Sequence, residues 1–168
     1  MKNSRSLYTV QSAIIAALYV VLTFISAAFG LASGVIQIRL SEALAILPYF
    51  CPAAVPGLTV GCLIANLLTG CAPWDVFFGS LATLIGALGA RALRKCQWLV
   101  PLPTIISNTV IIPFVLSWVY NIPGSIPYFM LTVGAGEVIS CGVLGMIFLF
   151  ALKPYSEKLF GRSQKGTE

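Results

Sequence analysis

The hydrophobic pattern divides the chain into six apolar segments, which are separated by short turns rich in glycine and proline. The predicted helices cover about residues 7–29, 38–50, 55–69, 74–92, 102–120 and 128–152. The first segment is apolar for about 23 residues, enough for the roughly 20 residues that cross a bilayer. The second is short for a full span. The pattern predicts a single all-α bundle of six helices covering residues 1–168.

The composition indicates that this bundle is a membrane protein. The 168 residues are 58% hydrophobic, and 9% are charged, whereas soluble domains carry about 25% charged residues. We therefore expect an all-α integral membrane protein with six transmembrane helices, surrounded by lipid. The first segment exceeds the roughly 7–15 apolar residues of a signal peptide, so we expect it to be retained. The net charge of +5 is better explained by loop charges than by a nucleic-acid partner.

The basic residues give the bundle a predicted orientation. With six spans, both termini and the turns after the second and fourth helices share one side. That side holds nine of the ten basic residues: Lys2, Arg5, Arg91, Arg94, Lys95, Lys153, Lys158, Arg162 and Lys165. Because basic loops stay in the cytoplasm, we expect both termini to be cytoplasmic in a multi-pass protein of the cell membrane.

Arg39 and Glu42 are the two charges that this pattern leaves at the start of the second helix. An ionised side chain at the centre of a membrane helix costs roughly 2.5–3.5 kcal/mol on insertion scales, so such residues usually have a function. At a spacing of i, i+3 they can share a helix face and partly neutralise each other. Glu42 either binds a ligand or neutralises Arg39, and Arg39 either positions Glu42 or holds the first loop.

Deeper polar residues predict a pocket. Glu137 lies roughly 13 Å below the outer end of the last helix, at 1.5 Å per residue, with no basic residue at that depth on the same helix. Asn66 and Asn108 lie within the third and fifth helices. Such groups normally face the interior of a bundle or a water-filled cavity, which predicts a pocket open to the outside. Alternatively, the two asparagines form interhelical hydrogen bonds, worth about 0.6 kcal/mol on average.

Three further residues near the outer helix ends allow two interpretations. Asp75 suits the start of the fourth helix, where a carboxylate meets free amides and the positive end of the dipole, and this role is favoured over ligand binding. Trp74 and Tyr128 could stack on a planar ligand. Each ring by itself fits the ordinary aromatic belt of membrane proteins better.

Catalytic and metal-binding patterns are missing from the sequence. There is no G-x-x-x-x-G-K-[ST] loop, no histidine and hence no nucleophile with a histidine base. The five cysteines are scattered and are interpreted as buried apolar side chains. We expect no catalytic residue, cofactor or metal site. A pocket without an energy source suggests a substrate-capture subunit that depends on partners.

Several motifs together resemble the QueT family. They are residues 38–44 (Ile-Arg-Leu-Ser-Glu-Ala-Leu), Pro56-Gly57-Leu58 leading to Asn66, residues 75–84, Asn108, and Gly136-Glu137. The resemblance extends from about Ser12 to Leu152. Members of this family are the substrate-binding S-components of energy-coupling factor (ECF) transporters and are proposed to import queuosine precursors.

The resemblance implies a fold and a set of partners. It implies a six-helix S-component with an outward pocket, capped by the loop Gly30 to Gln37. It also implies that a small-residue face of the first helix docks a membrane-embedded coupling subunit, and that two ATPase subunits supply the energy. The face consists of Ser12, Ala13, Ala16 and Ala17, where a serine replaces the first alanine of the family pattern. From spacing alone, these small residues fit packing inside the bundle equally well.

The implied cargo is a 7-deazaguanine base such as queuine or its aminomethyl or cyano precursor. Glu137 or Glu42 would accept its N–H edge, since charged acceptors make the stronger hydrogen bonds. Asn108 or Asn66 would meet the ring carbonyl, Trp74 or Tyr128 would stack, and Asp75 could meet an aminomethyl cation. The alternatives are an S-component for a vitamin such as thiamine or riboflavin, and a stand-alone channel or structural subunit.

Overall fold

The computed structural model describes residues 2–31 and 36–160, with side chains from residue 5 onward, and every element in this part is helical. Part of the expected capping loop (residues 32–35) and the tail charges Arg162 and Lys165 lie outside the described residues. The elements are α1 (Lys2–Ala28), η1 (Leu40–Tyr49), α2 (Ala54–Leu68), α3 (Pro73–Ala92), η2 (Gln97–Leu99), α4 (Leu102–Trp118), α5 (Ile126–Glu137), η3 (Val138–Leu144), α6 (Gly145–Leu152), η4 (Lys153–Tyr155) and α7 (Ser156–Phe160).

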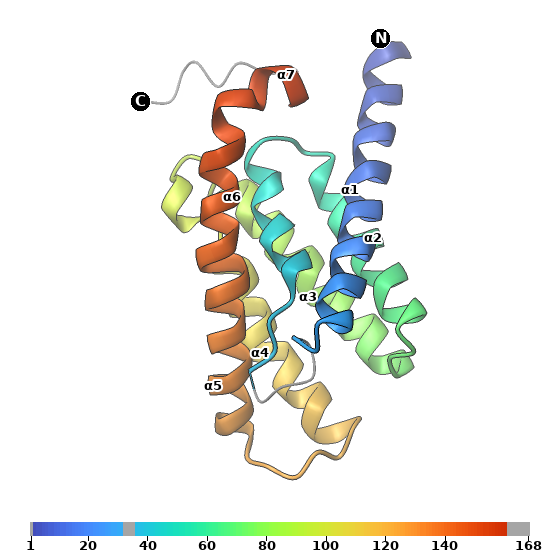
Figure 1. Cartoon of the computed structure of the whole chain (residues 1–168), viewed down its shortest axis with the longest axis vertical. Helices are drawn as coiled ribbons and strands as arrows, with labels where there is room; N and C mark the ends of the chain where they lie inside the picture. Colours follow the sequence, from blue (N-terminus) through green and yellow to red (C-terminus); the bar gives the residue numbers. More distant parts are fainter. Residues whose placement is uncertain (1, 32–35, 161–168) are drawn as a thin grey trace.

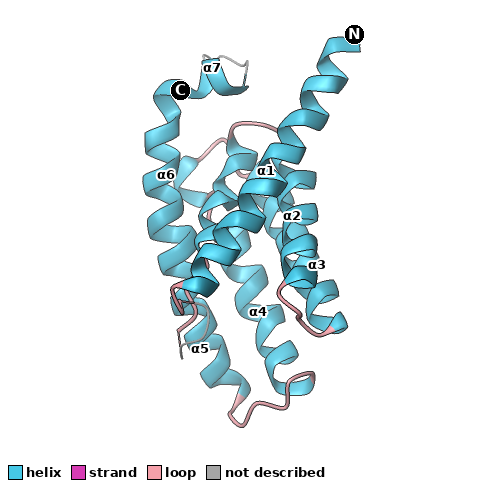
Figure 2. Cartoon of the chain, turned by 45° about the vertical axis from the view of Figure 1, so that its right-hand side comes forward, coloured by secondary structure: helices cyan, strands magenta, loops and turns pink. Residues whose placement is uncertain are grey.

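The helices form one bundle, in which the start of α1 and α7 lie at the same end (Figures 1 and 2). Four helical runs of the described chain are long and apolar enough to cross a membrane: Arg5–Ala28, Pro73–Ala92, Gln97–Trp118 and Ile126–Phe160. The predicted all-helical membrane bundle is therefore confirmed. In the described chain all six predicted segments are helical, as four runs of spanning length and two shorter apolar helices, η1 and α2.

The second predicted helix, residues 38–50, differs from expectation. It is a ten-residue 3₁₀ helix, η1, in the middle of the bundle, with Pro48 inside it and buried side chains around almost its whole circumference. A 3₁₀ helix rises about 2.0 Å per residue, so ten residues extend about 20 Å instead of about 15 Å. The tighter helix gives a short segment more reach. Figure 1 shows it as the cyan segment between α1 and α6.

Glycines on α2 let α1 approach closely. A Cβ atom on Gly57 would lie 2.8 Å from the carbonyl oxygen of Ser12, and one on Gly61 would lie 3.0 Å from the Cα of Ala16. The Ser12 hydroxyl also donates a 2.8 Å hydrogen bond to the carbonyl of Ala53. Ser12 and Ala16 therefore pack within the bundle, which is one of the two roles expected for the small-residue face of α1.

The last predicted helix, residues 128–152, is a continuous helical run with an interruption in its hydrogen-bond pattern. Its first part, α5, ends at Glu137, and the π-helical segment η3 follows before α6 begins. Such π-helical turns are rare in proteins, and those that occur often lie at functional sites. The change of pattern begins directly after Glu137, a buried carboxyl group.

Candidate functional site

Glu42 lies at the start of η1 and is buried against α1. Its side chain is 2% exposed, and the equally buried Tyr19 hydroxyl donates a hydrogen bond to its Oε1 atom. Its second oxygen, Oε2, is buried without a hydrogen-bond partner among the described residues. In the described part of the chain, one oxygen of this carboxyl group is therefore hydrogen-bonded and the other has no partner.

Glu137, at the end of α5, repeats this arrangement. Its side chain is 8% exposed, and the Nδ2 of Asn108 on α4 donates a 2.8 Å hydrogen bond to its Oε1. Its Oε2 is also buried without a partner in the described part of the chain. Asn108 therefore forms an interhelical hydrogen bond, one of the two roles expected for it, and its partner is Glu137.

A short extended segment before η1 joins the first and last spanning helices. The backbone N–H of Arg39 donates to Ser140 Oγ at 3.1 Å, and that of Leu40 donates to Ser26 Oγ at 2.8 Å. A Cβ atom on Gly136 would lie 2.1 Å from the carbonyl oxygen of Gln37, so only glycine allows this approach. The segment brings the start of η1 close to Glu137, and Glu42 and Glu137 interact electrostatically.

Arg39 does not share a helix face with Glu42 as the sequence suggested. Arg39 has extended backbone angles (φ −106°, ψ 107°) and precedes η1, so the i, i+3 geometry of a helix does not apply. Its guanidinium makes no hydrogen bond or ion pair with any described residue, although it interacts electrostatically with Glu42 and Asp75. A cation without a direct partner therefore lies near three carboxyl groups: Glu42, Asp75 and Glu137.

Asp75 and Asn66 lie close to each other, on either side of the turn between α2 and α3. Both flank Gly79, where a Cβ atom would lie 2.9 Å from Asn66 Nδ2 and 3.8 Å from Asp75 Oδ1. Asp75 lies in the first turn of α3, but no side-chain cap is formed there. Its Oδ2 instead accepts a 2.8 Å hydrogen bond from the hydroxyl of Tyr120, so the expected capping role is corrected.

Tyr120 lies beyond the end of α4 and ties two turns together. Its oxygen accepts a 3.1 Å hydrogen bond from the backbone N–H of Ala72, which immediately precedes α3. Burial and the neighbouring Asp75 carboxylate raise the pKa of Tyr120 to about 12. The phenol therefore stays protonated and keeps donating near neutral pH.

The two aromatic candidates lie at the surface of the bundle. Trp74 is 62% exposed and stacks on Phe78, with ring centroids 6.1 Å apart. Tyr128 is 48% exposed and lies 5.8 Å from the ring of Phe129. No contact of either ring with the buried carboxyl groups is seen among the described residues. Their exposure favours the aromatic belt, the simpler of the two interpretations.

Sequence reasoning missed the hydrogen bonds by which three residues hold the site: Tyr19, Tyr120 and Ser140. Tyr19 had a usable signal, because a buried tyrosine hydroxyl in an apolar helix normally requires a hydrogen-bond partner. Ser140 and Tyr120 had none. Their roles depend on a π-helical turn and on a loop contact, and neither leaves a periodic pattern in the sequence.

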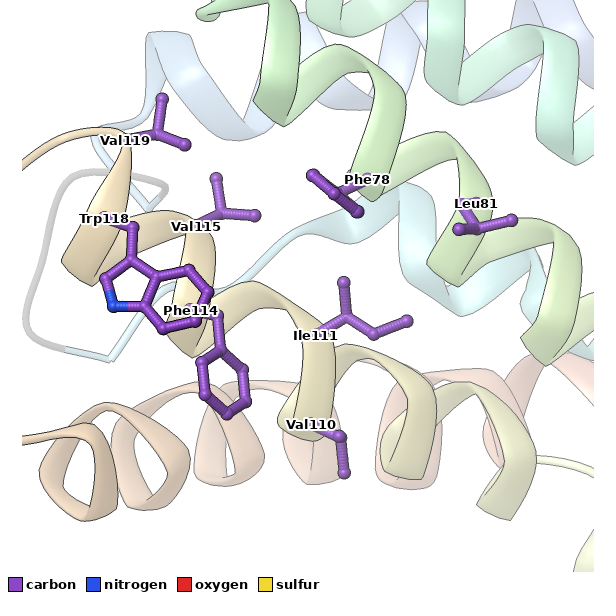
Figure 3. Close-up of a pocket in the computed structure, with 8 residues that line it drawn as sticks. All are labelled: Phe78, Leu81, Val110, Ile111, Phe114, Val115, Trp118 and Val119. Carbon is purple, nitrogen blue, oxygen red and sulfur yellow. The ribbon is translucent and has the colours of Figure 1, made fainter.

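A separate pocket of about 310 Å³ lies between α3 and α4 (Figure 3). Eight apolar residues line it, from Phe78 and Leu81 on α3 to Trp118 and Val119 at the end of α4. It presents no polar group that could recognise a heterocycle. The buried carboxyl groups are therefore the better candidate for specific binding.

Together these features define a helical membrane protein with a buried polar site whose carboxyl groups are only half satisfied. A family model described as "QueT transporter" matches residues 9–154, and the chain therefore belongs to the QueT transporter family. It is also 40% identical over 86 residues to the "Queuosine precursor transporter QueT" of Lactococcus lactis subsp. cremoris (strain MG1363). That match covers 51% of this chain and 50% of the relative, so it spans about half of either protein. No solved structure matches the chain.

Proposed function

We propose that this protein is the substrate-binding S-component of an ECF-type importer and captures a queuosine precursor, queuine or a related 7-deazaguanine, from the extracellular side. The family membership and the name of the relative support the cargo class. The observation that carries the proposal is the pair of buried carboxyl groups, Glu42 and Glu137, each with one oxygen that has no partner among residues 2–31 and 36–160. The chain itself is non-catalytic, and partner subunits hydrolyse ATP.

The chemistry of the two carboxyl groups supports a ligand rich in N–H donors. Buried polar atoms are nearly always hydrogen-bonded, so unpaired carboxyl oxygens require an explanation. A 7-deazaguanine offers adjacent N–H groups, which would satisfy Oε2 of Glu137 or Glu42 and form strong charge-assisted hydrogen bonds. Tyr19 and Asn108 fix the opposite oxygens and so orient both acceptors before the ligand arrives.

The other candidate residues receive secondary roles in this proposal. Asn66 or the amide oxygen of Asn108 meets polar groups of the ring system, and Asp75 attracts an aminomethyl cation electrostatically. Arg39 contributes positive charge near the carboxyl groups, without a direct ion pair to any described residue. Trp74 and Tyr128 are the stacking candidates if a ligand reaches the outer surface.

Binding to the purified full-length chain tests the proposal. Titration calorimetry in detergent should give saturable binding of queuine, 7-aminomethyl-7-deazaguanine or 7-cyano-7-deazaguanine, with guanine, thiamine and riboflavin as comparison ligands. Saturable binding of a vitamin without binding of any deazaguanine would replace the cargo. Absence of saturable binding to the whole panel would contradict the S-component proposal and favour a channel or structural subunit.

The orientation with both termini cytoplasmic is supported by the basic residues at one end of the bundle. Two native cysteines can test it, because Cys96 is exposed in the α3–α4 connection and Cys71 is partly exposed in the α2–α3 turn. In intact cells, a membrane-impermeant maleimide should label a variant that retains Cys71 alone and leave one that retains Cys96 alone unlabelled. Permeabilised cells should label both, and the reverse pattern in intact cells would invert the topology.

Docking to a coupling subunit is proposed for the free part of the α1 small-residue face. Ala13 and Ala17 are exposed, whereas Ser12 and Ala16 pack on α2. In a co-expressed complex with the coupling and ATPase subunits, Ala13→Leu/Ala17→Leu should lower co-purification at least tenfold. Ile14→Phe/Leu18→Phe is the control, because these exposed positions are turned by about 100° around α1. Equal co-purification of both variants would exclude this face.

A further inference from the structure

A second polar pocket lies outside the carboxyl site, at the end of the bundle where α6 stops. It has a volume of about 310 Å³ and is built from three segments far apart in sequence. Arg94 and Lys95 come from the turn after α3, Trp98 from η2, Lys153 from the start of η4 and Tyr49 from the end of η1. Figure 1 shows the connection between α3 and α4, in yellow-green, beside α6.

The pocket has an excess of positive charge. Three of its seven lining residues, Arg94, Lys95 and Lys153, are cationic, and none is acidic. Arg94 and Lys95 are exposed and make no hydrogen bond or ion pair with any residue in the described ranges. Lys153 donates one 3.0 Å hydrogen bond to Gln97 Oε1, which fixes the end of α6 beside η2. The three cations come from two segments and can donate to an anion from several directions.

An apolar rim adjoins these cations. Trp98 is 64% exposed and packs edge-on against Phe150 of α6, with ring centroids 5.4 Å apart. Leu99 and Leu102 beside it are 39% and 42% exposed. Exposed tryptophan and leucine next to lysine and arginine are typical of the level where lipid headgroups meet acyl chains. A soluble anion would use the cations and leave this rim without a function.

We propose that this pocket binds the phosphate headgroup of an anionic phospholipid, with the acyl chains along Trp98 and Phe150. Basic pockets between transmembrane helices bind anionic headgroups in this way. The apolar rim and the membrane location favour a lipid over an acidic surface of a partner protein. The site is independent of the carboxyl site and of its cargo.

Tryptophan quenching can test the site in the full-length chain. A Trp74→Phe/Trp118→Phe variant keeps Trp98 as its one tryptophan, since the sequence has three and the other two are exposed. It is placed in lipid nanodiscs with equal mole fractions of bromine-labelled phosphatidylglycerol or bromine-labelled phosphatidylcholine. The phosphatidylglycerol label should quench Trp98 at least twofold more strongly. In the same background, Arg94→Gln/Lys95→Gln should reduce this ratio to about one.

The matched control is Arg5→Gln/Lys158→Gln, which removes two exposed cations from the same end of the bundle but outside the pocket. It should keep the twofold preference, and unchanged melting temperatures should show that both double variants fold. Equal loss of preference in both would indicate general surface charge and overturn the proposal. No preference in the parent would also overturn it, and would assign the pocket to a partner protein or, if inorganic phosphate alone shifts Trp98 emission, to a free anion.

Discussion

The described part of the chain contains two hydrogen bonds between a tyrosine and a carboxyl group, and they lie in different surroundings. Tyr19 and Glu42 are each 2% exposed, in the middle of the bundle. Tyr120 is 40% exposed and bonds the 8% exposed Asp75 beyond the end of α4. The chemistry is the same, but the buried pair leaves an oxygen of Glu42 unpaired where water does not reach it.

The difference separates a binding group from a structural contact. At the outer pair, the Tyr120 oxygen both donates to Asp75 and accepts from the backbone of Ala72, so it joins two turns. At the inner pair, Tyr19 satisfies half of a carboxyl group and leaves the rest for another donor. A buried unpaired acceptor costs about 1–3 kcal/mol, which a ligand can recover on binding.

The largest expected effect is at the second half-satisfied carboxyl group. With its amide oxygen at the Oε1 position, Glu137→Gln keeps the shape and the hydrogen bond from Asn108, but it replaces the acceptor Oε2 with an NH2 donor. Losing a charge-assisted bond of about 1.5–3 kcal/mol should weaken queuine binding roughly 100-fold in titration calorimetry. Glu157→Gln, in the exposed α7, is the control and should bind as the parent does. Binding of Glu137→Gln within threefold of the parent would remove Glu137 from the site.

The next effect should come from the backbone that holds the inner pair in place. Gly136→Ala would put a Cβ atom 2.1 Å from the carbonyl oxygen of Gln37, so the extended segment must move. We expect about 1–3 kcal/mol of destabilisation, as for overpacked cores, and at least a tenfold loss of affinity. Gly142→Ala is the control, because its nearest neighbour would be 3.7 Å away. Equal melting temperatures for both variants would show that the close approach is unimportant.

Tyr19→Phe tests the inner pair directly. It leaves both oxygens of Glu42 buried without the phenol, which should cost about 1–3 kcal/mol in thermal unfolding. Queuine affinity should fall about tenfold, since Glu42 loses its fixed orientation. An affinity equal to the parent, with the expected loss in stability, would assign Tyr19–Glu42 to structure alone.

Tyr120→Phe should have the smallest effect. The outer pair is half exposed, so its loss should cost less than about 1 kcal/mol and change queuine affinity less than threefold. Because the folded pKa of Tyr120 is raised to about 12, the contact should be intact below about pH 10 and be lost as the pH rises through 12. Ultraviolet titration of the phenol can follow this transition. An effect of Tyr120→Phe on affinity equal to that of Tyr19→Phe would remove the distinction between the two pairs.

Much of the fold follows from the hydrophobic pattern. The predicted segments 55–69, 74–92 and 102–120 agree with α2, α3 and α4 to within two residues at each end. Long apolar runs bounded by glycine and proline determine these helices locally. The second segment was harder to predict, because propensity does not distinguish a 3₁₀ from an α-helix. The central, fully buried position of η1 is set by its neighbours rather than by residues 40–49.

The site was predictable in part. Rare carboxyl and amide groups in apolar segments pointed to Glu42, Asn108 and Glu137, since such groups must face the interior. The pairing of Arg39 with Glu42 could not be obtained this way, because it assumed a helix where the backbone is extended. The contacts of Ser140 and Tyr120 depend on tertiary geometry, for which the sequence has no local marker.

The segment before η1 also has a consequence for motion. The amide of Leu40 is bonded to Ser26 of α1 and the amide of Arg39 to Ser140 of η3, so two adjacent amides connect the first and last spanning helices. Separating these helices requires at least one of the two bonds to break. In hydrogen–deuterium exchange, the amide whose bond breaks should therefore exchange at a rate set by the opening of the bundle. Its exchange would report directly on how often α1 and the last span come apart.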